Sequence, residues 1–210
     1  MYNKLQYISQ GNSVQEQLLN IHKALDNGCH WIQVRFKNQN ALEVFTLAEA
    51  VKMLCKEYLA TFIINDNVHL AKQLDADGVH LGLSDMSAKE ARIILGKTKI
   101  IGGTANTFED VLHRTAENCD YIGLGPFQFT TTKQNLSPIL GLEGYQSIIK
   151  QMKIKNIQIH IYAIGGITLE NVEDLMETGI HGIAVSGLIT KSQNSALLIN
   201  QLNEKLYGTI

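Results

Sequence analysis

The sequence contains little proline and no excess of charge of either sign. With two prolines in 210 residues and no serine- or glycine-rich tract, it offers no linker, and we expect a single domain over residues 1–210. The 18 Lys and Arg residues nearly balance the 20 Asp and Glu residues, which gives no electrostatic reason to expect nucleic acid or an anionic membrane as a partner. An anionic ligand would therefore need a local cluster of positive charge.

Targeting and membrane signals are also missing. The N-terminal stretch MYNKLQYISQ has no long apolar core of the kind found in signal peptides, and no apolar run approaches the length that crosses a bilayer. The default expectation is a cytoplasmic protein without a membrane partner. The sequence leaves the oligomeric state open, a homo-oligomer included.

The three cysteines, Cys29, Cys55 and Cys119, show neither CxxC spacing nor a histidine at the intervals typical of zinc sites. We interpret them as small buried apolar residues. The histidines form no Ser-His-Asp or Cys-His pair at a useful place, so covalent catalysis is not indicated. His30 and His80 lie in or beside predicted strands, and we expect core or edge residues there rather than ligands.

What the sequence does contain is a regular alternation of short apolar runs and amphipathic helical patterns. The runs are nearly continuous in apolar residues, which is typical of parallel strands covered on both faces. Eight of them precede helical segments: residues 5–9, 31–35, 62–65, 78–82, 99–103, 121–125, 161–166 and 182–186. The helices are expected near residues 14–26 and 41–58, after Asn67, from Ser87, Thr107, Leu142 and Leu169, and near 194–206. This order favours an α/β fold, a (β/α)8 TIM barrel, over an open doubly wound sheet.

The boundaries of these elements carry their own signals. The turns from helix to strand resemble one another, and each places Gly or Asn just past a helix, where a left-handed residue ends it; they span residues 26–34, 75–82, 117–125 and 177–185. Ser87 and Glu90 have the spacing of a capping box, and Thr107 and Thr168 are suitable helix caps.

Two acids follow consecutive strands of one βαβ unit, residues 63–86. Asp66 comes after the third apolar run and Asp85 after the fourth. Because parallel strands point the same way, both carboxylates should emerge at the carboxyl end of the sheet. Such a pair suggests Mg²⁺, with waters and substrate phosphates completing its coordination. The alternative, that Asp66 caps the next helix and Asp85 lies in a solvated turn, is equally compatible with this stretch.

The second strand leads into a cationic segment. Alternation along the strand places Gln33, Arg35 and Lys37 on one side, which inside a barrel faces the axis. Two positive charges directed at one cavity favour a phosphate or diphosphate as partner. A solvated strand end is the simpler alternative.

Three further strand ends are suited to ligands. Residues 102–106 are small and polar, and could contact a heterocycle or form an ordinary loop. The longest connection, residues 125–141, carries hydroxyls and Lys133 and fits a lid over a phosphorylated substrate. Glycines at 165–167 and 185–187 fit a monophosphate site after strands seven and eight. Together these features predict one metal, one monophosphate site and one cationic pocket, and hence two phosphorylated small-molecule substrates.

Seven blocks of the sequence form a specific pattern when taken in order, whereas any one of them would be weak. The blocks are QVRFK at 33–37, IND at 64–66, ADGVHLGLSDM at 76–86, GLGP followed by TTTK at 130–133, LGLEG at 140–144, AIGGI at 163–167 and GIAVSG at 182–187. With these blocks the chain resembles the thiamine-phosphate synthase (thiamine-phosphate pyrophosphorylase) family over nearly its whole length.

The resemblance implies a Mg²⁺-dependent transferase. Its reaction would condense 4-amino-2-methyl-5-hydroxymethylpyrimidine diphosphate with 4-methyl-5-(2-phosphoethyl)thiazole, or its carboxylated form, and release thiamine phosphate and pyrophosphate. The diphosphate would ionise before attack, so the protein must stabilise leaving pyrophosphate. The implied roles are metal binding by Asp66 and Asp85, diphosphate binding and catalysis by Arg35, Lys37 and Lys133 with Asn65, pyrimidine contact by Gln33 and Thr104, and thiazole phosphate binding by Thr130, Thr132, Gly166, Ser186 and Gly187.

The sequence departs from the family pattern at three places. Residues 104–106 stand where the family commonly has a serine and a histidine, Phe129 replaces a usual proline, and the first strand lacks a usual aspartate. Two alternatives stay open. One is a thiazole tautomerase, an isomerase on the same barrel that uses a histidine where this chain has Pro126. The other is a catalytically silent ligand-binding homologue.

Overall fold

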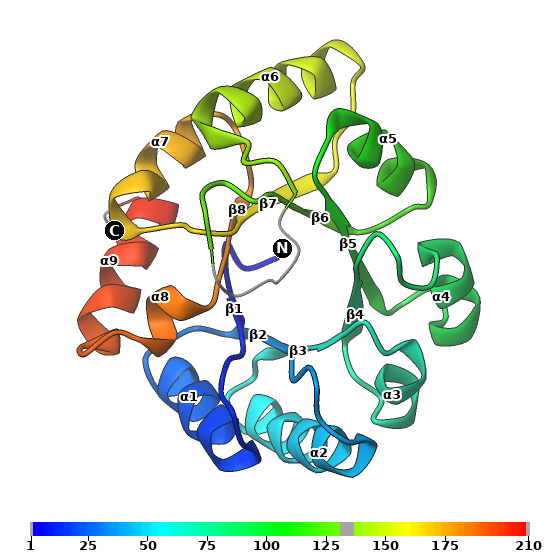
Figure 1. Cartoon of the computed structure of the whole chain (residues 1–210), viewed down its shortest axis with the longest axis vertical. Coiled ribbons are helices and arrows are strands. Elements are labelled where there is room, and N and C mark those ends of the chain that lie inside the picture. The colour runs from blue at the N-terminus through cyan, green and yellow to red at the C-terminus, as the bar shows by residue number, and fades with distance from the viewer. Residues whose placement is uncertain (1, 131–136, 209–210) are drawn as a thin grey trace.

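Eight parallel strands close into a barrel in the computed structural model, which describes residues 2–130 and 137–208 (Figure 1). Each strand pairs with the next along the chain, and β8 pairs with β1 through Tyr7 opposite Val185. The strands are β1 (Leu5–Ile8), β2 (Trp31–Val34), β3 (Thr61–Asn65), β4 (Gly78–Leu81), β5 (Ile100–Ala105), β6 (Tyr121–Leu124), β7 (His160–Ile164) and β8 (Gly182–Val185). The predicted (β/α)8 barrel is confirmed.

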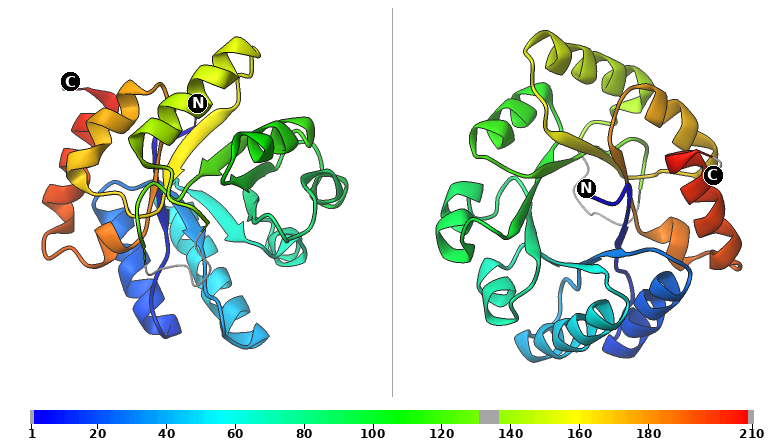
Figure 2. Two further views of the ribbon diagram at one scale, coloured as in Figure 1. Left: turned by 45° about the horizontal axis from the view of Figure 1, so that its top comes forward. Right: turned by 180° about the vertical axis from the view of Figure 1, so that it is seen from behind.

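The helices form a ring outside the strands (Figure 2). They are α1 (Val14–Asp26), α2 (Ala41–Glu57), α3 (Val68–Gln73), α4 (Ala88–Leu95), α5 (Phe108–Ala116), α6 (Gly141–Ile154), α7 (Val172–Glu177), α8 (Gly187–Thr190) and α9 (Ser195–Tyr207), with the 3-10 helix η1 (Leu169–Asn171) before α7. The expected starts agree with these within about two residues, the usual uncertainty of helix ends. The four-residue helix α8 was not predicted, because the sequence there reads as a continuation of the strand-end loop.

The predicted caps are present where helices begin. The Ser87 hydroxyl accepts a hydrogen bond from the backbone N–H of Glu90, and the Glu90 carboxylate accepts one from the backbone N–H of Ser87. Thr107 and Asp110 form the same reciprocal arrangement. Such caps satisfy backbone N–H groups that have no partner inside the helix, and each contributes about 1 kcal/mol. They fix where each helix starts after its strand, and so fix the intervening loops.

The helix-to-strand turns follow the expected pattern with one correction. Gly28, Asn118 and Gly179 adopt positive φ, as predicted. In the turn before β4, however, the left-handed residue is Asp75, and Gly78 lies inside the strand. A Cβ at Gly78 would come within 2.1 Å of the Ile100 carbonyl oxygen, so this glycine serves close strand packing rather than the turn.

An aromatic layer fills the amino-terminal half of the barrel. The rings of Trp31, Tyr121 and Tyr162 pack edge to face, with centroids 5.1 to 5.5 Å apart. All three side chains are fully buried. Each such contact is worth about 0.5–1.5 kcal/mol beyond simple burial. Because this layer fills the interior near the amino-terminal ends of the strands, a ligand is expected at their carboxyl ends, as in other TIM barrels.

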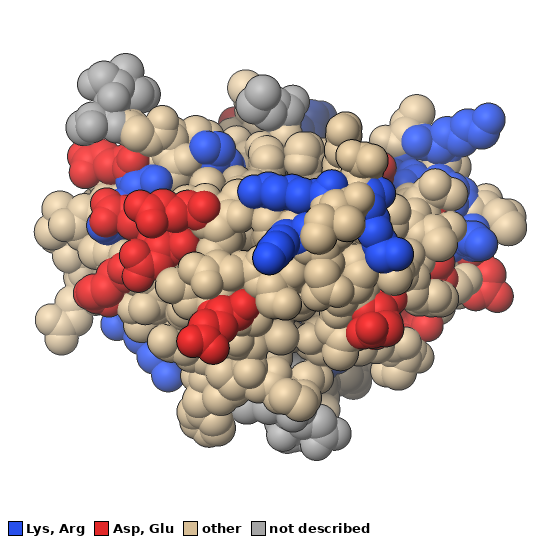
Figure 3. All heavy atoms as spheres, turned by 90° about the horizontal axis from the view of Figure 1, so that it is seen from above, with Lys and Arg blue, Asp and Glu red and all other residues tan. Residues whose placement is uncertain are grey.

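The three cysteines lie in the apolar core between the strands and the helices. Cys29, Cys55 and Cys119 are free thiols and all are buried, which confirms the interpretation from sequence. None of the described helices combines the length and apolarity that crossing a bilayer requires. On the face that carries α6, basic and acidic side chains lie next to one another (Figure 3).

Candidate active site

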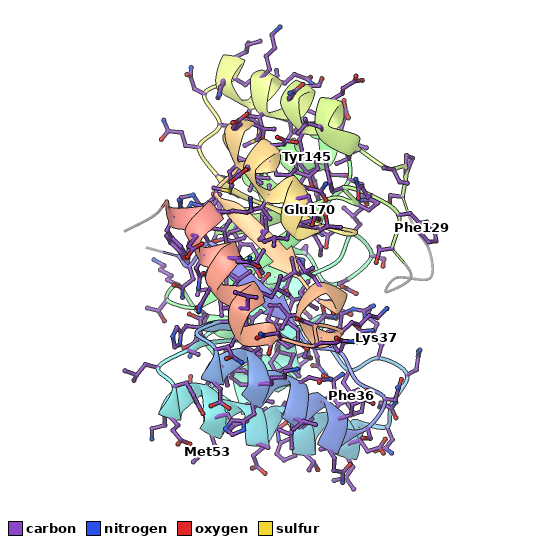
Figure 4. The ribbon with its side chains drawn as sticks, turned by 90° about the vertical axis from the view of Figure 1, so that its left-hand side faces the viewer. Phe36, Lys37, Met53, Phe129, Tyr145 and Glu170 are labelled. Atoms are coloured by element: carbon purple, nitrogen blue, oxygen red, sulfur yellow. The ribbon has the colours of Figure 1, made fainter. Side chains whose placement is uncertain are left out.

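The predicted site residues follow different strands but gather at one end of the barrel. Figure 4 places Lys37, which follows β2, and Phe129, which follows β6, at the same edge of the molecule. This edge holds the carboxyl ends of the strands, where the loops of a TIM barrel form its active site. Thr132 and Lys133 lie outside the residues that the structure describes.

The two acids singled out from the sequence lie together. The carboxyl groups of Asp66 and Asp85 are close enough to hydrogen bond. Burial is the main cause that raises the pKa of Asp85, and the contact with Asp66 is the second. Lys37 Nζ lies 2.9 Å from Asp66 Oδ2. Asp85 Oδ2 also accepts a hydrogen bond of 2.6 Å from the backbone N–H of Gly82. Two carboxylates are therefore held on the same rim beside an ammonium group.

The simpler alternative for Asp66 does not hold. Helix α3 is capped by the neighbouring Asn67, whose side chain accepts from the backbone N–H of Leu70 at 2.9 Å. Asp66 instead has a φ of 65°, a left-handed conformation that costs about 1–2 kcal/mol in an L-residue. Its backbone N–H donates to the His80 carbonyl at 2.8 Å, which ties the end of β3 to β4. This backbone conformation directs the Asp66 side chain toward Asp85 and Lys37.

The acidic pair fits a hard divalent cation with a small protein ligand set. Among the described residues, no three His, Cys, Asp or Glu side chains gather to hold a metal on their own. Mg²⁺ commonly takes one or two carboxylates and completes its shell with water and substrate phosphate. Burial and, after it, the neighbouring Asp66 carboxyl raise the pKa of Asp85, and a cation bound between the two carboxylates would favour the charged form that both effects disfavour.

Arg35 completes the charged side of this rim. Burial lowers the pKa of its guanidinium, and the carboxylate of Asp66 opposes that effect. Its backbone is fixed on both sides, because the N–H donates to Ser9 Oγ at 2.9 Å and the carbonyl accepts from Gln17 Nε2 at 3.2 Å. A partly buried guanidinium on a backbone fixed in this way is suited to binding an anion.

Below the charged groups, the barrel interior is polar. Gln33 Nε2 donates to Asn65 Oδ1 at 2.7 Å, while Gln33 Oε1 is buried and has no hydrogen-bond partner within the described residues. Across the barrel, Thr104 Oγ1 lies 3.1 Å from His80 Nε2, and His80 Nδ1 lies 3.0 Å from the Tyr121 hydroxyl. His80 is buried, as expected from the sequence, but its contact with Thr104 brings it to the floor of the site.

The loops after β6 and β7 are joined by backbone hydrogen bonds. The N–H of Phe127 donates to the Ile164 carbonyl and that of Gln128 to the Gly165 carbonyl, both at 2.9 Å. A Cβ on Gly166, which has a φ of 70°, would come within 2.7 Å of the Phe129 carbonyl oxygen. The loop just before Thr130 therefore lies directly beside the glycines that follow β7.

The end of β8 adds the last predicted group. Ser186 precedes the short helix α8, and Gly187 is its first residue. Ser186 Oγ donates to Gln10 Oε1 at 3.3 Å, so the loop after β1 contributes a residue that sequence analysis missed. No pattern in the sequence marked Gln10, because its partner lies 176 positions away.

A groove of about 360 Å³ lies elsewhere, on the outer surface between α6 and α7. Its walls include Lys150, Lys153, Asp174 and Glu177. These side chains are exposed on two outer helices, and none of them is among the predicted site residues.

The fold and the site together define a TIM-barrel enzyme with an acidic pair, adjacent cations and glycine-rich loops at its carboxyl-terminal rim. Comparison with known proteins specifies it further. A family profile described as thiamine monophosphate synthase matches residues 5–189. The chain therefore belongs to the thiamine monophosphate synthase family, and it is a transferase.

Individual relatives agree with this assignment. The thiamine-phosphate synthase of Flavobacterium psychrophilum is 73% identical over 206 residues, covering 98% of this chain and all of that protein. That of Flavobacterium johnsoniae is 64% identical over 210 residues, covering 100% and 99%. Among solved structures, thiamine phosphate pyrophosphorylase from Pyrococcus furiosus matches with a TM-score of 0.82 at 30% identity, over 97% of this chain and 95% of that one.

Proposed function

We propose that this protein condenses 4-amino-2-methyl-5-hydroxymethylpyrimidine diphosphate with a thiazole monophosphate, releasing thiamine phosphate and pyrophosphate. The observation that carries the proposal is the pair Asp66 and Asp85 beside Lys37. Two acids and a cation on one rim suit a leaving group that is a multivalent anion. Neither a thiazole isomerisation nor simple ligand binding needs this set.

Asp66 and Asp85 would hold Mg²⁺ in this proposal. When bound, the ion supplies positive charge to the oxygens of the departing pyrophosphate. Arg35 and Lys37 would bind the same anion as hydrogen-bond donors, and Asn65 and Lys133 would take part in binding it. Fixed donors of this kind matter most where charge develops, and removing one typically costs about 3–4 kcal/mol of transition-state stabilisation.

The pyrimidine would lie on the polar floor between Gln33 and Thr104. The amide oxygen of Gln33 is buried without a partner, a condition that costs about 1–3 kcal/mol. An exocyclic amino group is a donor of the right kind to satisfy it. Thr104 offers a hydroxyl on the opposite wall, where the family commonly has serine, so the hydroxyl is kept while a methyl group is added.

The thiazole phosphate would bind on the far side of the rim. Thr130 and Thr132 would offer hydroxyls, and backbone N–H groups at Gly166, Ser186 and Gly187 would offer further donors. The N–H groups that open a helix have no partner within it, which suits an anion. Support comes from the close approach of the Phe129 carbonyl to Gly166, which brings the loop after β6 next to the glycines after β7.

The test is an assay of pyrophosphate release with both substrates. We expect release only when the two substrates and Mg²⁺ are all present, and loss of release with EDTA that added Mg²⁺ restores. Asp66→Asn and Asp85→Asn should each lower turnover by at least about a hundredfold, the scale of a lost charge-stabilising group. Asp75→Asn is the matched control, because Asp75 lies on the opposite rim, paired with Lys99 and 79% exposed.

Other results would point to the alternatives. Conversion of the thiazole alone, without pyrophosphate, would indicate a tautomerase. Affinity for both ligands without any product would indicate a silent homologue. Full activity in EDTA, or in either aspartate variant, would refute the metal assignment while leaving the condensation itself intact.

A further inference from the structure

Arg114, on helix α5, is buried against the outer side of β5 and contacts the ends of two strands. Its Nε donates to the Thr104 carbonyl at 3.1 Å, and its Nη2 donates to the Gly82 carbonyl at 2.7 Å. The side chain is 3% exposed. One guanidinium group thus holds the backbone at the end of β5 and the backbone just past β4.

Both of these backbone segments carry proposed site residues. The residue held at β5 is Thr104 itself. The residue held past β4 is Gly82, whose N–H donates to the Asp85 carboxylate at 2.6 Å and whose carbonyl accepts from the Asp85 N–H at 3.2 Å. The turn from Gly82 to Asp85 is therefore closed by two hydrogen bonds of its own. A third, from Arg114 to the Gly82 carbonyl, fixes its position.

The surroundings are adapted to this side chain. A Cβ on Gly103 would come within 2.7 Å of Arg114 Cδ, so the arginine occupies space that any other residue at 103 would need. The charge is balanced by Glu117, whose Oε2 lies 2.8 Å from Arg114 Nη1 and which is 6% exposed. The ion pair is almost completely removed from solvent.

A buried ion pair is a poor way to gain stability. Desolvating the two charges costs several kcal/mol each, and well-packed apolar residues in the same place are often equally stable or more so. What an arginine provides and an apolar residue cannot is a set of donors in fixed directions. Here those donors reach the Thr104 carbonyl on β5 and the Gly82 carbonyl just past β4.

We propose that Arg114 is a positioning residue that holds Asp85 and Thr104 in register, and so couples the metal side of the site to the pyrimidine side. The inference rests on the proposed function for the identity of the ligands. Outer contacts that orient metal ligands commonly change metal affinity by about 10–100-fold when removed. The thiazole phosphate side, built from the loops after β6 to β8, has no contact with Arg114 among those described.

The test replaces the ion pair as a whole. Arg114→Met alone would leave Glu117 as an uncompensated buried charge and could unfold the chain, so the main variant is the double substitution Arg114→Met with Glu117→Met. Mn²⁺ binding to the substrate-free protein is measured by electron paramagnetic resonance. We expect about tenfold weaker binding in the folded double variant. Because Mn²⁺ binding needs no turnover, this result stands apart from whether the wild-type protein releases pyrophosphate.

Steady-state kinetics provide the second measurement. The KM for the pyrimidine diphosphate should rise about tenfold, and the KM for the thiazole phosphate should stay within about twofold. Arg114→Lys, which keeps the charge but offers one nitrogen in place of three, should give the same selective pattern in milder form.

Arg92→Met is the matched control. Arg92 on α4 makes an analogous clamp at the opposite rim, where it donates to the Lys99 carbonyl and pairs with Asp120 at 2.6 Å. It should lose stability without a change in Mn²⁺ affinity. Unchanged Mn²⁺ affinity in the folded double variant would overturn the proposal. So would an equal rise in both KM values, since this would reflect general loosening of the barrel.

Discussion

The ammonium group of Lys37 lies 2.9 Å from a carboxylate oxygen of Asp66, which makes a proposed diphosphate ligand the partner of a proposed metal ligand. The two side chains are 51% and 30% exposed, and pairs this accessible to water are worth about 0–1 kcal/mol. The pair can therefore open at little cost. In the ligand-free protein Lys37 partly offsets the repulsion between Asp66 and Asp85, and it is available to an anion once a cation takes over that role.

Replacing Lys37 should accordingly move two affinities in opposite directions. In Lys37→Met, Mn²⁺ binding to the free protein should tighten several-fold, because a competing positive charge has gone. The KM for the pyrimidine diphosphate should rise about tenfold or more, the value of a hydrogen bond to a charged group. Spectroscopic titration and initial-rate kinetics measure the two quantities.

The control for this variant is Lys99→Met, which breaks a similar pair with Asp75 at the other rim and should change neither affinity. If Mn²⁺ binding weakens in Lys37→Met, the ammonium does not compete with the cation and the assignment of Lys37 is wrong.

Gln33 should show a trade between stability and activity. Its amide oxygen is buried and unpartnered, so Gln33→Met removes an unsatisfied acceptor while conserving most of the volume. The substitution also removes the hydrogen bond to Asn65 Oδ1, but Asn65 is partly exposed and can bind water instead. We expect the free energy of unfolding to stay level or rise, and kcat/KM for the pyrimidine diphosphate to fall about 5–150-fold, equivalent to about 1–3 kcal/mol. Denaturant unfolding and kinetics test the two halves. A stability loss with unchanged kinetics would mean that the orphaned oxygen faces no ligand.

Alanine substitutions at Gly166 and Gly28 distinguish the effect of backbone strain from the effect on the geometry of the site. Both have positive φ, but a Cβ on Gly166 would collide with the Phe129 carbonyl, whereas one on Gly28 would meet nothing within 4 Å. Alanine at either position should cost roughly 1 kcal/mol or more of stability. Only Gly166→Ala should also raise the KM for the thiazole phosphate, since it pushes the loop after β6 away from β7. Equal kinetics in the two variants would remove Gly166 from the phosphate site.

The fold can be predicted from the sequence because the caps and turn residues mark the same element boundaries as the alternation of apolar runs and helical patterns. Caps such as Ser87 and turn residues such as Gly179 lie next to the elements that they delimit, so a linear pattern suffices. The acidic pair could be found in the same way, because Asp66 and Asp85 follow adjacent parallel strands and strand direction alone brings them to one rim.

The supporting contacts could not be found this way. Arg114 reaches Gly82 from 32 positions away, and only the packing of α5 against β5 determines that its donors face those carbonyls. His80 was assigned correctly to the core, but its hydrogen bond to Thr104 depends on the register of β4 against β5. Such contacts depend on side-chain direction across strands, which a pattern of apolar residues does not specify.

The buried thiols give a prediction in which the effect of pH has a definite sign. Burial raises the pKa of Cys29, Cys55 and Cys119 to about 12, whereas an unfolded chain has thiols near the ordinary value of about 8.5. The unfolded state therefore loses protons first as pH rises. The contribution of the protonated thiols to stability is complete below about pH 8.5 and is lost progressively toward pH 12.

Two measurements follow from that shift. At pH 8 the native protein should react only slowly with a disulfide reagent such as 5,5′-dithiobis(2-nitrobenzoic acid), because the thiolate is the reactive form, and three thiols should appear on unfolding in guanidinium. The free energy of unfolding should fall between pH 8 and pH 10. Prompt labelling of any cysteine in the folded protein would show that the barrel opens around that residue far more readily than its packing indicates, and stability that rises over this pH range would contradict the assigned sign.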